Sequence, residues 1–306
     1  MTRRSWGLFA AMCVIWGIPY LLIRVAVRDI EPGTLVFLRT GIGGLILLPI
    51  ALTRSAPGWG FGPVLARWRP LLAFAVIEMA VPWLFLSDAE RHVSSSLSGL
   101  LIAAVPLIGV LAARLSGSQE RATRLQLGGL LVGLVGVAML VGLDFGEVHS
   151  GALLEILVVV IGYATAPVIM ARRLADLPSV PVVCASLLLV AVGYLPYAVL
   201  RWPRHVTGEE AGSVALLGVI CTALAFVVFF ALISAIGPAR ATVITYVNPA
   251  VAVLFGVTML GESFTLGMAV GFPLILAGSV LGARRIEPVV AGPEAAVAET
   301  TTVTPR

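Results

Sequence analysis

The sequence has few charged residues and contains no lysine. Of its 306 residues only 12% are charged, 59% are hydrophobic, and the 20 basic side chains other than histidine are all arginines. A soluble domain of this length needs far more polar surface than so few charged residues can provide. The arginines form no single patch, so the net charge of +4 does not indicate nucleic-acid binding. The composition predicts a membrane protein with no nucleic-acid partner.

Several kinds of catalytic and metal-binding motif are absent as well. The three cysteines lie in apolar runs without C-x-x-C spacing, which indicates buried side chains rather than a disulfide or metal framework. The three histidines fall in expected loops, and no G-x-S-x-G, H-E-x-x-H or nucleotide-binding P-loop occurs. We therefore expect no metal, no cofactor and no enzymatic activity. An intramembrane enzyme or a non-transporting receptor or scaffold is the alternative.

Ten apolar runs are long enough to cross a bilayer core, which takes about 20 helical residues. Because lipid offers backbone groups no hydrogen-bonding partner, each run is expected to be an α-helix. The expected limits are 6–24, 33–53, 70–88, 95–114, 124–143, 150–171, 180–200, 211–236, 240–260 and 265–283. The sequence predicts an all-α membrane protein with ten transmembrane helices.

Arginine placement indicates the orientation of these helices. Fourteen arginines fall on one side of the membrane and five on the other, with Arg39 inside a span. Both termini are therefore expected in the cytoplasm, and the location in the inner or plasma membrane. The tail over 287–306 lacks helical periodicity and is expected to be a disordered cytoplasmic segment.

Two stretches of the chain repeat at a separation of 143 residues. V-I-E-M-A from Val76 recurs as V-I-C-T-A from Val219, and Pro106 recurs as Pro249. Five spans per copy is an odd number, so the second copy must enter the membrane from the opposite side. This predicts two inverted five-helix repeats, an arrangement typical of secondary transporters. The expected limits of the two repeats are 6–143 and 150–284.

Five short patterns along the chain are informative together. They are R-H-V-S-S-S-L-S-G-L-L-I-A-A-V-P-L from Arg91, N-P-A-V-A-V from Asn248, L-G-E ending at Glu262, F-L-R ending at Arg39, and Trp16-Gly17. Over residues 6–284 the chain resembles the EamA family of the drug/metabolite transporter superfamily. In the first copy, S-Q-E ending at Glu120 carries one extra residue where L-G-E is usual. The resemblance implies a permease that exports or exchanges amino acids, metabolites or drugs.

One ionisable side chain, Glu78, is predicted near the middle of the third span. A carboxylate at that depth costs about 2.5–3.5 kcal/mol and normally faces a cavity or a partner. The second copy has Cys221 at the equivalent position, so the shared architecture does not require an acid. Glu78 is therefore a candidate for binding substrate or exchanging protons. A neutral, hydrogen-bonded structural acid is the alternative.

Arg39 and Glu155 are expected at similar depth, about six and five residues from one side of the membrane. An ion pair across the bundle is one interpretation. The other is that Arg39 extends alone to the interface, which its long side chain allows. The sequence leaves the two open.

Prolines and glycines indicate bending and close packing. Pro106 and Pro249 are candidate gating hinges, with ordinary helix curvature as the alternative, and Asn248 can bond a carbonyl freed by Pro249. Glycines in the fifth and tenth spans follow small-xxx-small spacing, which favours tight packing within the molecule or in a homodimer. These glycines are Gly129, Gly133, Gly136, Gly267, Gly271, Gly278 and Gly282.

The sequence predicts a secondary transporter, exporting small metabolites, amino acids or drugs by alternating access. Trp16, Tyr163 and Tyr246 lie deep in helices that resemble the family's cavity-lining set. The expected substrate- or proton-binding residues are Glu78, Trp16, Tyr163, Thr222, Tyr246, Asn248 and Glu155. Small-molecule substrate and lipid bilayer are the expected partners. The substrate, the direction of transport, proton coupling and the oligomeric state are left open.

Overall fold

A computed structural model describes residues 2–53, 60–109, 124–142, 150–237, 241 and 243–283. Within these ranges the chain is α-helical, with short π-helical turns and no strand. Six helical segments are long and apolar enough to cross a membrane: Arg3–Ala26, Pro32–Thr53, Trp68–Ala89, Ser150–Leu174, Ser179–Leu200 and Gly208–Ile236. Four shorter apolar helices are Ser95–Gly109, Leu125–Val141, Ile244–Leu260 and Leu266–Leu281. The predicted all-helical membrane fold is confirmed, whereas the tail over 287–306 lies outside the described residues.

The individual helices are interrupted at several points within these segments. The first half of the chain forms α1 (Arg3–Ile15), α2 (Pro19–Ala26), α3 (Pro32–Thr53), α4 (Phe61–Ala66), α5 (Trp68–Ala75), the π turn η1 (Val76–Ala80), α6 (Val81–Ala89), α7 (Ser95–Ile102) and α9 (Arg124–Gly142). The second half forms α10 (Ser150–Ile169), η2 (Met170–Leu174), α11 (Ser179–Leu200), α12 (Gly208–Gly218), η3 (Val219–Leu224), α13 (Ala225–Ile236), α15 (Ile244–Leu260) and α16 (Leu266–Ala283).

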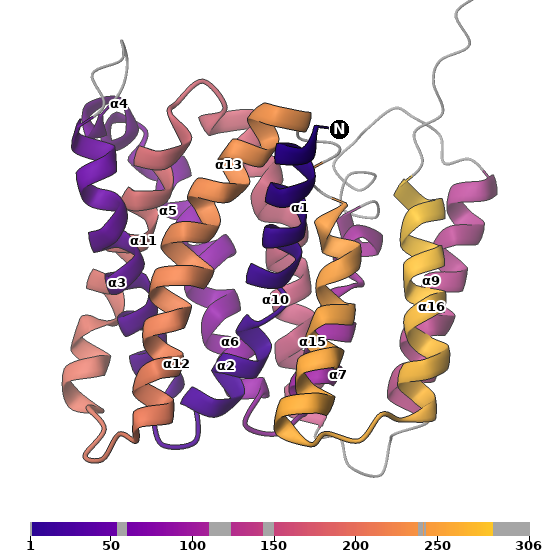
Figure 1. Ribbon diagram of the computed structural model, residues 1–306. Helices are drawn as coiled ribbons and strands as arrows, with labels where there is room; N and C mark the ends of the chain where they lie inside the picture. Colours follow the sequence, from indigo (N-terminus) through magenta and orange to yellow (C-terminus); the bar gives the residue numbers. More distant parts are fainter. Residues whose placement is uncertain are drawn as a thin grey trace, which may run out of the picture.

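The helices run between two faces of the molecule, the N-terminal face at the top of Figure 1 and the opposite face at the bottom. The chain passes from α5 at the top through η1 to α6 below it. The segment with the matching sequence passes from α12 at the bottom through η3 to α13 at the top. The two segments that repeat in sequence therefore run in opposite directions.

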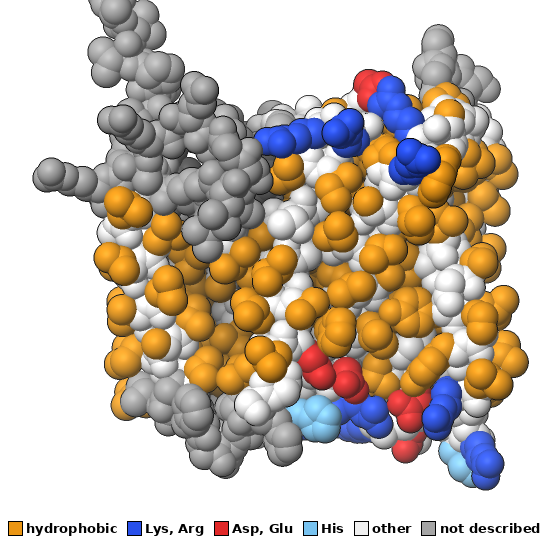
Figure 2. All heavy atoms as spheres, turned by 180° about the vertical axis from the view of Figure 1, so that it is seen from behind, with side chains coloured by type: hydrophobic (Ala, Val, Ile, Leu, Met, Phe, Trp, Pro, Cys, Tyr) orange, Lys and Arg blue, Asp and Glu red, His pale blue; other side chains and the backbone are white. Residues whose placement is uncertain are grey.

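The surface between the two faces is apolar. Figure 2 shows a broad band of hydrophobic side chains, with arginine and acidic side chains gathered at its two ends. Many large aliphatic side chains of the described residues are exposed; Val192, for example, is 69% exposed and Leu131 is 66% exposed. Such a belt suits a hydrocarbon environment and its charged ends suit the two membrane interfaces.

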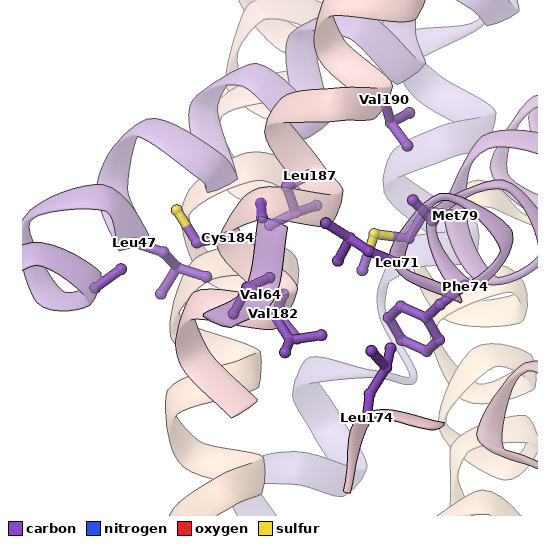
Figure 3. Packing of buried hydrophobic residues seen from close by; sticks show 14 of the residues in the cluster. Leu47, Val64, Leu71, Phe74, Met79, Leu174, Val182, Cys184, Leu187 and Val190 are labelled. Carbon is purple, nitrogen blue, oxygen red and sulfur yellow. The ribbon is translucent and has the colours of Figure 1, made fainter. Parts of the chain in front are cut away.

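Helices of the first half pack mainly against helices of the second half. α3 packs along α11, α7 along α15 and α9 along α16. The first span, α1 and α2, packs on α13 and α12, while α6 packs on α10. The largest apolar cluster joins α3, α5, η1 and α11, with side chains such as Leu47, Met79 and Leu187 interdigitating (Figure 3). Since lipid tails are as apolar as leucine, these contacts stabilise the bundle through close packing.

The glycines of α9 and α16 meet each other reciprocally. A β-carbon at Gly136 would lie 2.9 Å from the Gly271 carbonyl oxygen, and one at Gly271 would lie 2.7 Å from the Gly136 carbonyl oxygen. A β-carbon at Gly278 would likewise lie 2.6 Å from the Gly129 carbonyl oxygen. The predicted glycine face therefore packs within the molecule, and a homodimer stays a prediction.

The prolines act differently from one span to the next. α1 ends at Ile15 and α2 begins at Pro19, so this proline starts a new helix. Pro106 follows a turn at residues 103–104, after which the helix resumes at 105–109. Its repeat equivalent, Pro249, lies inside the continuous helix α15. The two candidate hinges thus have different backbones, and gating by either stays a prediction.

Candidate functional site

Two π turns, η1 and η3, mark the positions where the sequence repeats. η1 is V-I-E-M-A and η3 begins V-I-C-T-A. A π turn adds one residue to a helical turn and leaves backbone carbonyls free to bond side chains, and such turns are frequent at functional sites. The duplicated sequence therefore forms the same backbone distortion twice.

The first π turn carries Glu78 and is supported by the second half. Oε2 of Glu78 is buried and has no hydrogen-bond partner among the described residues. On one side Gly162 of α10 approaches so closely that a β-carbon there would lie 2.6 Å from the Ile77 carbonyl oxygen. On another side the Tyr194 hydroxyl of α11 donates to the Ala80 carbonyl oxygen at 2.9 Å. The turn is thus held in place while its carboxyl group remains incompletely bonded.

The second π turn carries Thr222, which is fully buried. Its hydroxyl donates to the Leu217 carbonyl oxygen, five residues earlier, at 2.8 Å. The same oxygen accepts a hydrogen bond from Nε of Arg39 at 3.0 Å. Because Arg39 belongs to α3, this bond joins the two halves of the chain.

Arg39 is buried in the interior rather than extended to the interface. Only 7% of it is exposed, and its guanidinium carbon lies 3.7 Å from the centroid of the Trp83 ring. A cation over an indole face contributes about 2 kcal/mol when desolvated. Among the ion pairs of the described residues, none joins Arg39 to Glu155. Both sequence interpretations of Arg39 are therefore wrong, since Thr222 and Trp83 hold it inside the bundle.

Tyr163 lies between the two π turns. It packs against two of the apolar clusters, and its hydroxyl lies near the Trp83 side chain. Its electrostatic neighbours include both Arg39 and Glu78. Thr222 is thus bonded to Arg39, and Tyr163 neighbours both Arg39 and Glu78, whereas Glu78 is not among the electrostatic neighbours of Arg39.

Trp16 and Asn248 form a second group, between α1 and α15. The Trp16 ring lies 4.7 Å from the Phe229 ring, measured between centroids. With its side-chain amide turned so that the nitrogen faces these carbonyl oxygens, Asn248 donates to Cys13 at 3.2 Å and to Ile244 at 3.0 Å. Asn248 thereby connects α15 to α1, but its acceptor within α15 is Ile244 rather than the residue four positions before Pro249, whose carbonyl was the predicted partner. Tyr246, another predicted site residue, is half-buried at the start of α15.

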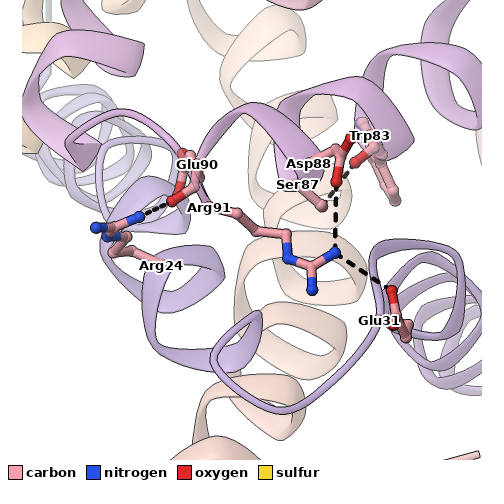
Figure 4. A network of polar contacts seen from close by, with 7 residues as sticks. All are labelled: Arg24, Glu31, Trp83, Ser87, Asp88, Glu90 and Arg91. Atoms are coloured by element: carbon pink, nitrogen blue, oxygen red, sulfur yellow. Dashed lines mark hydrogen bonds and ion pairs between the residues drawn. The ribbon is translucent and has the colours of Figure 1, made fainter. Parts of the chain in front are cut away.

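Glu155 is the predicted site residue that lies apart from these groups. It contacts Asp88 on α6, near the opposite face, and its Oε2 is buried without a partner among the described residues. Asp88 in turn lines a cavity of about 240 Å³ together with Glu31, Leu84, Phe85, Tyr194 and other residues. Arg91 pairs with Glu31 at 3.3 Å and with Asp88 at 3.6 Å (Figure 4).

Glu90 is a buried acid that the sequence did not identify. It is fully buried, both carboxyl oxygens lack partners among the described residues, and its backbone carbonyl accepts from Arg24 (Figure 4). Burial raises the pKa of Glu90 well above its ordinary value, and Glu262 adds to the rise while Arg24 and Arg39 oppose it. Nothing in the sequence marks Glu90, because it directly follows the end of a span, where acids are usually solvated.

At the opposite face the L-G-E pattern connects the end of α15 to the start of α7. We call this contact, formed by Glu262, Ser95 and Ser96, the latch. Gly261, at φ +68°, ends α15 and turns the chain so that Glu262 points at the start of α7. Its carboxylate accepts from the backbone N–H groups of Ser95 at 2.7 Å and Ser96 at 2.9 Å, and from the Ser96 hydroxyl at 2.5 Å. A carboxylate satisfies the free N–H groups of a helix start and complements its dipole. The counterpart in the first copy, Glu120, lies outside the described residues.

An exposed ion pair links the two halves at each face. Arg67 pairs with Asp176 at the N-terminal face, and Arg28 pairs with Glu209 at 3.5 Å at the opposite face. Hydrogen bonding from the Arg67 guanidinium lowers the pKa of Asp176 below its ordinary value. The described residues contain no group of three or more side chains suited to hold a metal ion.

The fold and the repeat in the sequence agree with what comparison with known proteins finds. The EamA-like transporter family matches the chain twice, over residues 5–142 and 150–283. This chain belongs to the EamA-like transporter family. It is a multi-pass membrane protein that acts on a small-molecule substrate in a lipid bilayer.

Named relatives support the same general role. The chain is 32% identical to the uncharacterized inner membrane transporter YedA of Escherichia coli K12, over 85% of this chain and 84% of YedA. It is 26% identical to a probable terminal-alkyne amino-acid exporter of Streptantibioticus cattleyicolor, over 92% of this chain and 91% of that protein. A solved crystal structure has the same fold, with a TM-score of 0.63 and 21% identity over 92% of this chain and 97% of that one.

Proposed function

We propose that this protein is a secondary transporter that exports small molecules by alternating access between two inverted five-helix repeats, 6–143 and 150–284. The family matches the two halves separately, and the matched segments around η1 and η3 run in opposite directions. The reciprocal glycine contacts of α9 and α16 have the form expected of a two-fold axis, in which residue i meets j and j meets i. We place both termini in the cytoplasm, so that the opposite face is extracytoplasmic.

The observation that carries the proposal is the polar cluster where the two halves meet. Arg39 and Trp83 come from the first half and Thr222 and Tyr163 from the second. A movement of one half against the other must alter this cluster, so a molecule bound there can favour one arrangement over the other. The latch joins α15 to α7 at the extracytoplasmic face, so we assign this arrangement to a carrier closed toward the outside.

Glu78 is the proton-coupling residue in this proposal. It is an acid in the middle of a span, its Oε2 is buried without a partner, and its repeat equivalent is a cysteine. Ionisable groups at such depth mark ion pathways and proton relays in transporters. Loss and gain of a proton at Glu78 would link the carrier cycle to a pH gradient.

The test is transport in proteoliposomes with amino acids, other small metabolites and lipophilic cationic drugs, with and without an imposed pH gradient. We expect accumulation of at least one class to follow the gradient, and Glu78→Gln to abolish that dependence. Cys221→Ala, at the equivalent position of the other repeat, is the matched control and should retain it. Thermal unfolding in detergent checks that each variant is folded. Accumulation by folded Glu78→Gln that still follows the gradient would overturn proton coupling through this residue, and no transport of any class would overturn the carrier proposal.

A further inference from the structure

Arg39 carries a buried positive charge that no ionised acid neutralises at close range. The ion pairs of the described residues do not include it, and the hydrogen bond resolved for its guanidinium is that of Nε to Thr222. A guanidinium has five N–H donors, four of them on the two Nη atoms. The contact with Trp83 covers a face of the group rather than its outer edge.

The surroundings of Arg39 do not supply the missing charge. Its electrostatic neighbours are the hydroxyls of Tyr163 and Tyr20, the Cys221 thiol and the Glu90 carboxyl. Phenols and thiols are uncharged at neutral pH unless strongly perturbed toward ionisation. Glu90 is fully buried with both oxygens unpartnered, and burial raises its pKa, so its neutral form is favoured. All four neighbours therefore leave the guanidinium without a full counter-charge.

Packing alone gives no reason for a charge at this position. Burying an ion costs several kcal/mol unless a partner compensates it, and an amide side chain could donate to Thr222 without that cost. An arginine is favoured where its planar fork must receive a carboxylate or phosphate through two parallel hydrogen bonds. Arg39 stands where the two halves of the chain meet, which is where a transported molecule would bind.

We infer that the Arg39 guanidinium binds a carboxylate group of the transported molecule, so that the substrates of this protein are carboxylate-bearing compounds. This rests on the proposed function and narrows its substrate class. The Thr222 bond holds one edge of the guanidinium and Trp83 supports its face, so the outer edge is oriented before the ligand arrives. Such preorganisation reduces the entropic cost of binding. A bound carboxylate then supplies the counter-charge that the protein lacks.

The test compares ligands that differ in one group. Thermal unfolding in detergent is followed while L-phenylalanine, 3-phenylpropionate, the methyl ester of each, phenethylamine or sodium chloride is titrated, since a ligand that binds the folded state raises its stability. The variants are Arg39→Gln and Arg39→Lys, with Arg69→Gln as the matched control. Arg69 also stacks on a tryptophan, at 5.3 Å from the Trp68 centroid, but is exposed. The same ligands are tested for counterflow in proteoliposomes.

We expect at least one carboxylate to bind wild type and Arg69→Gln at least tenfold more tightly than its ester. Arg39→Gln should lose that selectivity, and Arg39→Lys, which keeps the charge without the fork, should retain part of it. The inference is overturned if no carboxylate stabilises wild type more than its ester, if Arg39→Gln keeps the selectivity, or if chloride alone produces the same shift. Counterflow of esters or amines without carboxylate selectivity would leave the transporter proposal standing and refute this one. Carboxylate binding through Arg39 without any counterflow would support this site and count against transport.

Discussion

The two π turns, η1 and η3, have the same place in the repeat and the same backbone form, but their side chains differ. At η3 Thr222 makes two hydrogen bonds, one of them to Arg39 across the interface between the halves. At η1 the equivalent of Thr222 is the buried core residue Met79, and Glu78 has an unpartnered oxygen. One turn is tied to the opposite half by a polar side chain, whereas the other holds an unsatisfied acid.

The comparison shows how a duplicated element can take on two roles. The backbone distortion is present in both copies, and a glycine of the other half approaches each turn closely, Gly162 at Ile77 and Gly43 at Thr222. The chemistry differs at only two positions, where Glu78 and Met79 match Cys221 and Thr222. In this account η3 fixes the geometry of the guanidinium and η1 supplies the group that exchanges a proton.

The largest effect is expected from Glu78→Cys, which gives η1 the residue found at the equivalent position of η3. Because this removes the acid from the proposed coupling site, we expect substrate accumulation driven by a pH gradient to fall by about 5- to 150-fold, the range of typical coupling energies. Initial rates in proteoliposomes measure the effect, and counterflow without a gradient is the control. Undiminished gradient-driven accumulation would mean that the acid in η1 has no special role.

The hydrogen bond between Arg39 and Thr222 at η3 is tested by Thr222→Val. This leaves a buried, charged donor without its acceptor, and we expect a loss of about 1.5–3 kcal/mol of unfolding free energy. Denaturant unfolding in mixed micelles measures it. Met79→Leu, at the equivalent position of η1, is the control and should cost less than about 1.5 kcal/mol as a volume-conserving change. If both substitutions lower the unfolding free energy equally, Thr222 contributes no more to the stability of η3 than Met79 does to that of η1.

The support of η1 by the second half is tested by Gly162→Ala. A β-carbon would lie 2.6 Å from the Ile77 carbonyl oxygen, so α10 must shift, at a cost of about 1–3 kcal/mol. Gly151→Ala on the same helix meets open space and should stabilise by about 0.5–1 kcal/mol. Thermal unfolding of the two variants measures the difference. A neutral Gly162→Ala variant would show that the close approach is not needed.

The smallest effect is expected at the exposed ion pairs. Arg67 lowers the pKa of Asp176 in the folded state below the value in the unfolded chain, which is about 3.9. The ion pair therefore stabilises the folded state fully above about pH 3.9, and this stabilisation is lost as the pH falls through the pKa of the folded state. Asp176→Asn should therefore be slightly less stable than wild type at pH 7, and the gap should close as the pH falls below about 4. Unfolding midpoints across this range measure it. Because both side chains are exposed, a large effect at neutral pH would be unexpected.

Much of the fold could be predicted because hydrophobic runs and arginine placement are local signals. The six long spans lie close to their predicted limits, although the first is divided into two helices at Pro19. The π turns could not be predicted, since their hydrophobic pattern reads as continuous helix. The repeat marked their positions without indicating their conformation.

The site was predicted less completely, because its contacts join residues far apart in the sequence. Glu78, Tyr163 and Thr222 were identified, but the bond between Arg39 and Thr222 spans 183 positions and leaves no local pattern. Glu90 was missed because burial at the end of a span depends on neighbouring helices. Glu262 was recognised as part of a pattern, but its role as a helix cap became evident only from the position of α7.

Alternating access itself is tested most directly by measuring distances at both faces when the latch is weakened. Spin labels at His92 and Ser263 report on the opposite face, and labels at Leu125 and Val243 report on the N-terminal face. Glu262→Gln removes the charge that bonds the start of α7, so we expect the first distance to lengthen and the second to shorten in double electron–electron resonance. If both distances lengthen together, or if the latch opens with no change at the N-terminal face, the two halves do not alternate.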